Sequence, residues 1–141
     1  MQKLAPLALA MLFALPSCAA LAQSTDRTRA GVEAAEGWLA LVDGGQIAQA
    51  DMAAALKSAV TPAQWATAVQ QARAPFGAFK SRKLVSAQFS ARLPGAPQGE
   101  YVVIQYATTF ANGNATETVT PAREADGSWK VSGYFIKNLS R

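Results

Sequence analysis

The sequence of 141 residues contains no histidine and a single cysteine, Cys18. Without histidine the chain can form no Ser-His-Asp triad, no Cys-His pair, no histidine general base and no His-ligated zinc site. Its nine acidic residues include no D-x-D-x-D-G calcium loop. We therefore expect no metal and no cofactor, and we assign no catalytic residue.

Residues 1–22 have the three parts of a secretory signal peptide. Lys3 supplies the charged start, residues 4–15 are an apolar stretch, and Ala20-Leu21-Ala22 is an A-x-A cleavage signal. Cleavage after Ala22 removes the only cysteine, so the mature chain has no disulfide. We expect a periplasmic or secreted protein.

Two alternatives exist for this N-terminal segment. A membrane span needs about 20 uninterrupted apolar residues, and Pro6 and Pro16 interrupt the run, so we predict no span. The second alternative is a lipid anchor at Cys18, because Leu15-Pro16-Ser17-Cys18 resembles the bacterial lipobox. Proline two places before the cysteine fits that motif poorly.

The basic residues gather at Lys80-Ser81-Arg82-Lys83, with Arg73 and Arg92 nearby, in a chain of net charge +4. Such a cluster can attract phosphates or anionic lipid, and binding to the envelope surface is one hypothesis for it. The alternative interpretation is that these basic residues lie in a solvated loop and at the start of a strand and have no binding role. We expect no nucleic-acid partner for an exported protein.

Three helices are predicted after a flexible leader at residues 23–29. The first has apolar residues at helical spacing, namely Ala35, Trp38, Leu39 and Val42, and ends at Gly44-Gly45. The second covers residues 46–58 and is rich in alanine. The third begins at Pro62, behind a capping pair of Thr61 and Gln64, and stops before Pro75.

Four strands follow in the second half of the chain. From Lys83 the apolar period changes to two, which predicts inward side chains at Val85, Ala87, Phe89 and Ala91. Further strands are predicted at 101–110, 116–123 and 129–137. Pro121 is expected at an edge or a bulge, because it cannot donate to a strand ladder.

These elements predict one α+β domain over residues 30–141, with three N-terminal helices packed on a four-stranded antiparallel β-meander. The strand at 101–110 is apolar on both sides, and Tyr101 and Val103 lie on the side opposite Val102, Ile104, Tyr106 and Phe110. That second side is a candidate contact with another subunit. A homodimer or a periplasmic partner protein is therefore the kind of partner we expect.

A series of short motifs runs along nearly the whole mature chain: Trp38-Leu39-Ala40-Leu41-Val42-Asp43-Gly44-Gly45, Arg73-Ala74-Pro75-Phe76-Gly77, Ser81-Arg82-Lys83-Leu84, Pro94-Gly95-Ala96-Pro97 with Gly99-Glu100-Tyr101-Val102-Val103, and Glu117-Thr118-Val119-Thr120-Pro121 with Gly127-Ser128-Trp129-Lys130-Val131-Ser132-Gly133-Tyr134. Together they resemble a bacterial exported family known as domain of unknown function 4019. The resemblance implies export and a single domain, and it implies no established activity. A looser analogy leads to the cone-shaped NTF2-like and cystatin-like folds, which host both enzymes and binding modules.

The candidate ligand-binding residues are Arg73, Arg82, Tyr106, Glu117, Trp129 and Tyr134. Tryptophans 38, 65 and 129 either line a pocket between helices and sheet or form the core. The two tyrosine hydroxyls either contact a ligand or reach solvent at the sheet edge.

Glu117 is either an exposed strand carboxylate or one partner of a buried pair with Arg73 or Arg82. The two arginines can instead hold an anionic ligand in a bidentate grip, and Arg73 can alternatively bind carbonyl groups at its helix end.

The sequence favours a non-enzymatic binding or interaction module whose target is a partner protein, a second copy or a small ligand. The alternative is an NTF2-like enzyme, or a small apolar ligand-binding protein, with a pocket between helices and sheet. In the enzyme, Glu117 or Asp51 would be the base and Tyr106 or Tyr134 the proton donor.

Overall fold

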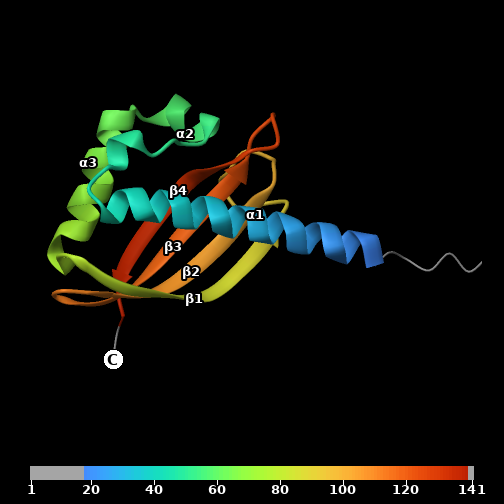
Figure 1. Ribbon diagram of the computed structural model, residues 1–141. Coiled ribbons are helices and arrows are strands. Elements are labelled where there is room, and N and C mark those ends of the chain that lie inside the picture. Colours follow the sequence, from blue (N-terminus) through green and yellow to red (C-terminus); the bar gives the residue numbers. More distant parts are fainter. Residues whose placement is uncertain (1–17, 140–141) are drawn as a thin grey trace, which may run out of the picture.

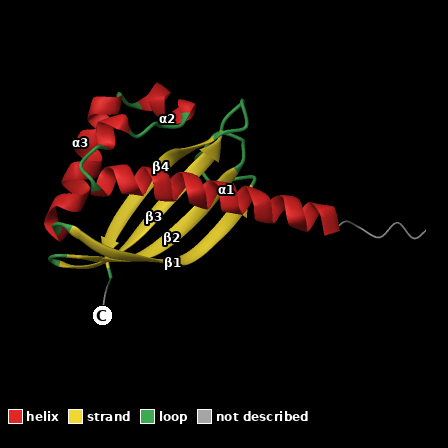
Figure 2. Cartoon of the chain, viewed as in Figure 1, coloured by secondary structure: helices red, strands yellow, loops and turns green. Residues whose placement is uncertain are grey.

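The computed structural model describes residues 18–139 of the chain. The helices are α1 (Cys18–Asp43), α2 (Ala54–Ala59) and α3 (Pro62–Arg73), with short 3-10 turns at η1 (Ile47–Gln49) and η2 (Ala74–Phe76), and the strands are β1 (Phe79–Ser90), β2 (Tyr101–Phe110), β3 (Gly113–Arg123) and β4 (Trp129–Asn138). The helices thus precede the strands along the chain, and Figure 2 distinguishes the helices from the strands by colour. Most of the predicted signal peptide and the side chain of Cys18 lie outside the described part.

The four strands form one antiparallel sheet in the order β1-β2-β3-β4, which is a meander. Helix α1 runs across one face of this sheet, and α2 and α3 lie beside its C-terminal half (Figure 1). The predicted α+β architecture is therefore confirmed. Within the described residues, no helix is both long enough and apolar enough to cross a membrane.

Helix α1 ends where the sequence predicts but begins earlier. Gly45 adopts a positive φ of 74°, and the amide of Gln46 donates to the Leu41 carbonyl at 2.8 Å, which closes the C-terminal end. Residues 23–29, which the sequence predicts as a flexible leader, are helical. Arg27 ties this part to the sheet through an ion pair with Glu100 at 3.2 Å and a contact with the Phe89 ring.

The second predicted helix is largely replaced by other structure. Residues 46–58 contain only the turn η1 and most of the short helix α2. Between them Met52 pairs with Val131 of β4, and the amide of Ala53 donates to the Val131 carbonyl at 2.9 Å. Burial of Met52 and Ala53 against β4 breaks a helix that alanine content alone favours.

Helix α3 has the predicted start and end. The hydroxyl of Thr61 accepts from the amide of Gln64, and the side chain of Gln64 accepts from the amide of Thr61, which completes the capping box. The predicted bulge at Pro121 is also present, between Thr120 and Pro121.

Strand β1 departs from the predicted alternation. A bulge lies between Leu84 and Ser86, so Arg82 and Leu84 share the helix-facing side with Ala87 and Phe89. Val85, predicted to point inward, is 60% exposed, and Ala91 lies beyond the strand and is exposed. The bulge shifts the alternation by one residue, so even-numbered residues face α1 directly before it and odd-numbered residues face α1 after it.

The core joins α1 to the helix-facing side of the sheet. Trp38 and Leu39 pack with Val102, Ile104 and Val119, and Trp65 packs against the same cluster. Trp38 lies 5.2 Å from Tyr134 and 6.3 Å from Trp65 between ring centroids, so both tryptophans belong to the core. Tyr101 on the opposite side is already buried within the chain, where its hydroxyl donates to the Pro97 carbonyl.

Gly31 lets α1 approach the sheet closely. A Cβ placed on Gly31 would lie 2.6 Å from Cγ2 of Val102, whereas one placed on Gly37 would have no neighbour within 4 Å. We expect Gly31→Ala to lower the free energy of unfolding by about 1–3 kcal/mol because the core is overpacked. Gly37→Ala, the matched control, should raise it by up to about 1 kcal/mol through helix propensity.

Urea unfolding of both variants and the wild type tests this pair. A Gly31→Ala variant that gains as much stability as Gly37→Ala would show that the helix can move away from Val102 at no cost.

Candidate functional site

Glu117 on β3 is the most deeply buried charged group of the described chain, with a side chain that is 0% exposed. Its register partner is Tyr106, and both face α1. Oε1 accepts from Nε and Nη2 of Arg82 at 2.9 and 2.7 Å and from the Thr108 hydroxyl at 2.5 Å. Oε2 accepts from the Tyr134 hydroxyl at 2.5 Å. The carboxylate is therefore held by residues of β1, β2 and β4 together.

Arg82 bridges Glu117 to Asp43, the last residue of α1. Nη1 and Nη2 of Arg82 donate to Asp43 at 2.8 and 3.1 Å, and its guanidinium lies over the rings of Phe79 and Tyr106. Burial by itself would lower the pKa of Arg82, but the hydrogen bonds to Asp43 and the charge of Glu117 outweigh it and raise that pKa. Arg82 is thus an inward residue, whereas its neighbours Lys80 and Lys83 are exposed.

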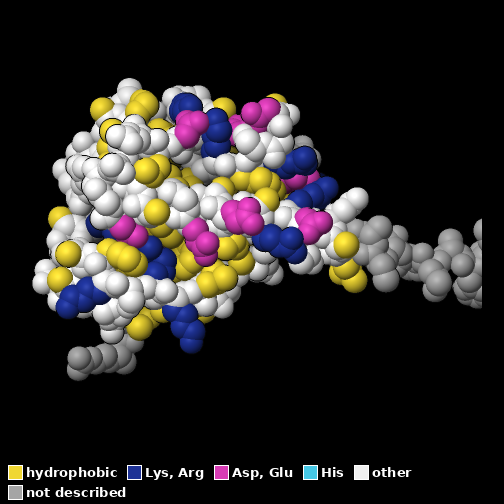
Figure 3. Space-filling model, viewed as in Figure 1, with side chains coloured by type: hydrophobic (Ala, Val, Ile, Leu, Met, Phe, Trp, Pro, Cys, Tyr) yellow, Lys and Arg dark blue, Asp and Glu magenta, His cyan; other side chains and the backbone are white. Residues whose placement is uncertain are grey.

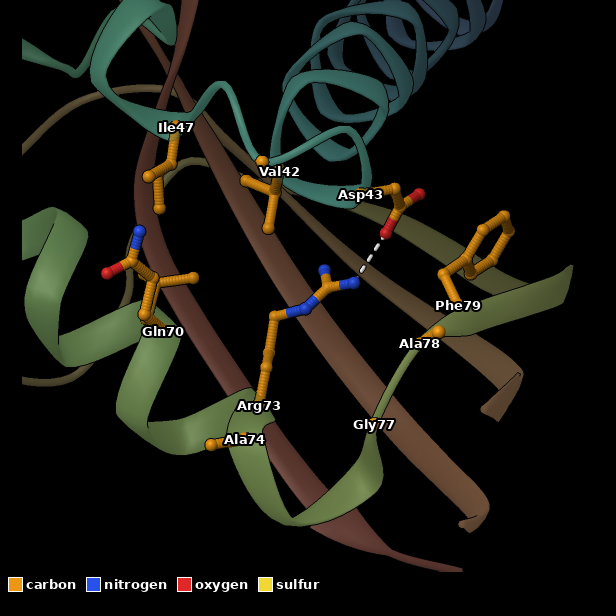
Figure 4. A pocket seen from close by; sticks show the side chains of 11 residues that line it. Val42, Asp43, Ile47, Gln70, Arg73, Ala74, Gly77, Ala78 and Phe79 are labelled. Atoms are coloured by element: carbon orange, nitrogen blue, oxygen red, sulfur yellow. Dashed lines mark hydrogen bonds and ion pairs between the residues drawn. The ribbon is translucent and has the colours of Figure 1, made fainter. Parts of the chain in front are cut away.

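Arg73, the last residue of α3, reaches the same two carboxylates. Its Nη2 donates to Asp43 Oδ1 at 2.5 Å, and its Nη1 lies 3.5 Å from Oε2 of Glu117. The guanidinium also lies over the ring of Phe110 at 5.2 Å. Figure 4 shows Arg73 extending from α3 toward Asp43, so it contacts the carboxylates and is not directed at the end of its own helix.

We call Asp43, Arg73, Arg82 and Glu117 the ion cluster. The two arginines and Asp43 are only 11–12% exposed. The formal charges of the two guanidinium groups and the two carboxylates sum to zero, so each buried charge has its counter-ion. The sequence predicts a buried pair of Glu117 with Arg73 or with Arg82, and the structure contains both pairs.

Asp43 and Thr108 are site residues that sequence reasoning missed. Asp43 did carry a signal: an acidic residue in the last turn of a helix is unfavourable with the helix dipole and calls for a cationic partner. Thr108 carried none, because a threonine in a strand is ordinary.

A hollow of about 280 Å³ opens beside the ion cluster, between the ends of α1 and α3 and the start of β1 (Figure 4). We call it the Arg73 hollow. Its lining is mainly apolar and comprises Val42, Asp43, Gly45, Ile47, Val69, Gln70, Arg73, Ala74, Gly77, Ala78 and Phe79. Acidic and basic atoms reach the surface among apolar ones in the region below α1 (Figure 3).

Arg73 has hydrogen-bonding capacity left over in this hollow. A guanidinium has N–H donors on Nε, Nη1 and Nη2, and within residues 18–139 the recorded bonds of Arg73 come from Nη1 and Nη2 only. Its Nε–H therefore remains for another acceptor. Asp43 likewise accepts only from the two arginines within that range.

A second hollow of about 280 Å³ lies on the other side of Asp43 and Phe79, which line both. Its further lining residues are Glu36, Leu39, Ala40, Arg82, Leu84 and Tyr106. The hydroxyl of Tyr106 is buried and has no hydrogen-bond partner in the described part of the chain. Burial and the negative charge of Glu36 raise the pKa of Tyr106 to about 12.

Trp129 and Asp51 lie apart from the ion cluster. They line a separate hollow of about 230 Å³ with Trp38, Lys130 and six other residues. Asp51 pairs with Lys57 and Lys130, both at 2.6 Å, and hydrogen bonds from these lysines hold the pKa of Asp51 well below its usual range. Of the six predicted ligand-binding residues, the structure therefore brings four together around the fifth, Glu117, and leaves Trp129 elsewhere.

Glu117 is poorly suited to act as a general base. Glu117 accepts from five N–H or O–H groups, and a carboxylate has about four lone-pair sites. No acceptor position is left for a substrate proton. Within residues 18–139 no group of three or more His, Cys, Asp and Glu side chains is placed to hold a metal ion.

The model of a family described as "Protein of unknown function (DUF4019)" matches residues 34–134, so the chain belongs to this family. The resemblance carried by the sequence motifs is thereby confirmed. The matched range contains the whole ion cluster. Neither a curated protein nor a solved structure matches the chain.

The two tyrosines of the site should respond in opposite ways to loss of the hydroxyl. Tyr134→Phe leaves Oε2 of Glu117 without its shortest donor, and we expect the free energy of unfolding to fall by about 1.5–3 kcal/mol. Tyr106→Phe removes a buried hydroxyl without a partner, so stability should be unchanged or rise by about 1 kcal/mol. Chemical denaturation of both variants measures this, and equal losses would contradict the assignment.

Stability should fall at alkaline pH because of the same residues. Burial, the charge of Glu117 and the hydrogen bond to it raise the pKa of Tyr134, as burial raises that of Tyr106. A folded-state pKa above the unfolded value of about 10 favours the protonated form in the fold. The contribution is complete below about pH 10 and is lost as the pH rises through the folded-state values.

We expect the wild type to lose up to about 1.4 kcal/mol per pH unit for each such tyrosine above pH 10. Unfolding free energies measured between pH 9 and about pH 12 should fall less steeply in Tyr106→Phe and in Tyr134→Phe. Identical slopes in all three proteins would contradict the prediction.

Proposed function

We propose that this member of the DUF4019 family is an exported, non-enzymatic module that binds a small and largely apolar molecule in the Arg73 hollow. The observation that carries the proposal is the unused Nε–H of Arg73 within an apolar lining. Binding sites of small molecules combine such linings with a few fixed polar groups that orient the ligand.

The ion cluster supports binding because it holds Arg73 in place before a ligand arrives. Arg73 is fixed by Asp43 on one side and by the ring of Phe110 on another. A side chain already ordered loses little conformational freedom when it binds. The hollow therefore has a rigid polar end and, along Val42, Ile47 and Val69, an apolar wall.

The enzyme alternative is less well supported. Glu117 has its acceptor sites occupied, and Asp51 is half-exposed and paired with two lysines whose hydrogen bonds lower its pKa. A general base needs a free lone pair and a pKa near the working pH. Neither carboxylate offers both.

Export is proposed from the N-terminal sequence. The charged start, apolar stretch and A-x-A signal of residues 1–22 support a cleaved signal peptide. When the full chain is expressed in a bacterial host, it should appear in the periplasm or the medium with Gln23 as its first residue. Cell fractionation and N-terminal sequencing measure this. An acylated chain beginning at Cys18 would replace this proposal with the lipid anchor.

Ligand binding can be tested with a blocked hollow and a matched control. Ala74 and Ala72 are both exposed alanines near the end of α3, but only Ala74 lines the Arg73 hollow. Native mass spectrometry of gently purified protein should detect a bound small molecule in the wild type and in Ala72→Leu. The added mass should be absent or at least tenfold less abundant in Ala74→Leu.

Two results would overturn the binding proposal. One is the absence of added mass in the wild type, provided that the sample is not exposed to organic solvent or denaturant. The other is an equal amount in Ala74→Leu, which would place the ligand outside this hollow.

A further inference from the structure

The charged lining of the Arg73 hollow consists of one ion pair. Among the residues that line it, only Asp43 and Arg73 carry charge, and they are joined by a 2.5 Å bond between Nη2 and Oδ1. The formal charge of the lining is therefore zero. The hollow nevertheless presents a strong donor, the Nε–H of Arg73, and a strong acceptor, the carboxylate of Asp43.

A charged ligand would be attracted by one member of this pair and repelled by the other. A carboxylate at Arg73 would lie beside the carboxylate of Asp43, and an ammonium at Asp43 would lie beside the guanidinium of Arg73. Both residues are only 11–12% exposed, so water screens such repulsion weakly. The charged ligand would also lose its own hydration on entering.

A neutral group that carries a hydrogen-bond donor next to an acceptor is repelled neither by Asp43 nor by Arg73. An amide has this arrangement, because its carbonyl accepts and its N–H donates. The carbonyl would accept from Arg73 while the N–H donates to Asp43, and both bonds are strengthened by the protein charge. Val42, Ile47, Val69 and Phe79 would surround an apolar body attached to the amide.

We infer that the Arg73 hollow selects neutral amides with a small branched or aromatic apolar body over carboxylates and ammonium ions of the same skeleton. This inference rests on the proposed function, since it names the class of ligand for the same hollow. The volume of about 280 Å³ limits the ligand to a small molecule or one residue of a larger one.

The experiment compares three probes with one skeleton: 4-methylpentanamide, 4-methylpentanoate and 4-methylpentylammonium. Each is titrated into the purified, isotope-labelled protein at neutral pH, and binding is followed through the backbone amide signals of Val69, Ala74 and Ala78, which line the hollow. We expect the amide to bind at least tenfold more tightly than either ion, which corresponds to about 1.4 kcal/mol.

Two reciprocal variants make the charge argument specific. Asp43→Asn gives the lining a formal charge of +1 and should shift the preference toward 4-methylpentanoate, whereas Arg73→Gln gives it −1 and should shift the preference toward 4-methylpentylammonium. Asp51→Asn, in an ion pair that lies outside this hollow, is the control and should keep the wild-type order. If either cluster variant fails to fold, the inference is judged on the affinity ranking of the three probes for the wild type and on the result for the other variant.

A carboxylate or ammonium that binds the wild type as tightly as the amide overturns the inference. So does the absence of any shift in the hollow with all three probes. Neither result decides the proposed function, because the mass of the molecule that co-purifies, and its loss in Ala74→Leu, are measured independently of these probes.

Discussion

The burial of the Glu117 carboxylate is the constraint on which the rest of this structure depends. A fully desolvated charge is very unfavourable unless hydrogen bonds and an opposite charge accompany it. Here the donors come from Arg82 on β1, Thr108 on β2, Tyr134 on β4 and, at longer range, Arg73 on α3. One carboxylate therefore joins all four strands and a helix, and the sheet can form this contact set only in its observed register.

Bringing two arginines to Glu117 creates a second requirement, because one carboxylate cannot neutralise two guanidinium groups. Asp43 meets it from the C-terminal end of α1. An aspartate there is unfavourable with the helix dipole, and the two guanidinium groups offset that cost. The ion cluster thus determines where α1 ends relative to β1 and α3, which apolar packing alone specifies less sharply.

The same arrangement explains the character of the Arg73 hollow. Its floor contains strong hydrogen-bonding groups, but the charges of Asp43 and Arg73 cancel, so this hollow is polar at one end without being anionic or cationic there. The basic stretch at residues 80–83 is weaker as an anion site than its sequence suggests, because Arg82 is turned inward and paired. This favours recognition by directed hydrogen bonds over attraction by net charge.

Local signals in the sequence determined the order of the elements, the limits of α3 and the meander. The Thr61 and Gln64 cap, the proline at 75 and the β-branched and aromatic residues at 101–110 each act over a few residues, so no distant contact is needed to predict them. The family follows from short motifs in the same way. The pairing of Glu117 with Arg73 or Arg82 was one of two alternatives that the sequence left open.

Only the tertiary structure decided between those alternatives and placed the remaining parts of the site. The break at Met52 depends on Val131, and the inward position of Arg82 depends on a bulge at Val85. The partner of Arg73 is Asp43, thirty residues away in the chain. Each of these features depends on residues that are distant in sequence and adjacent in space, and local propensity carries no information about such contacts.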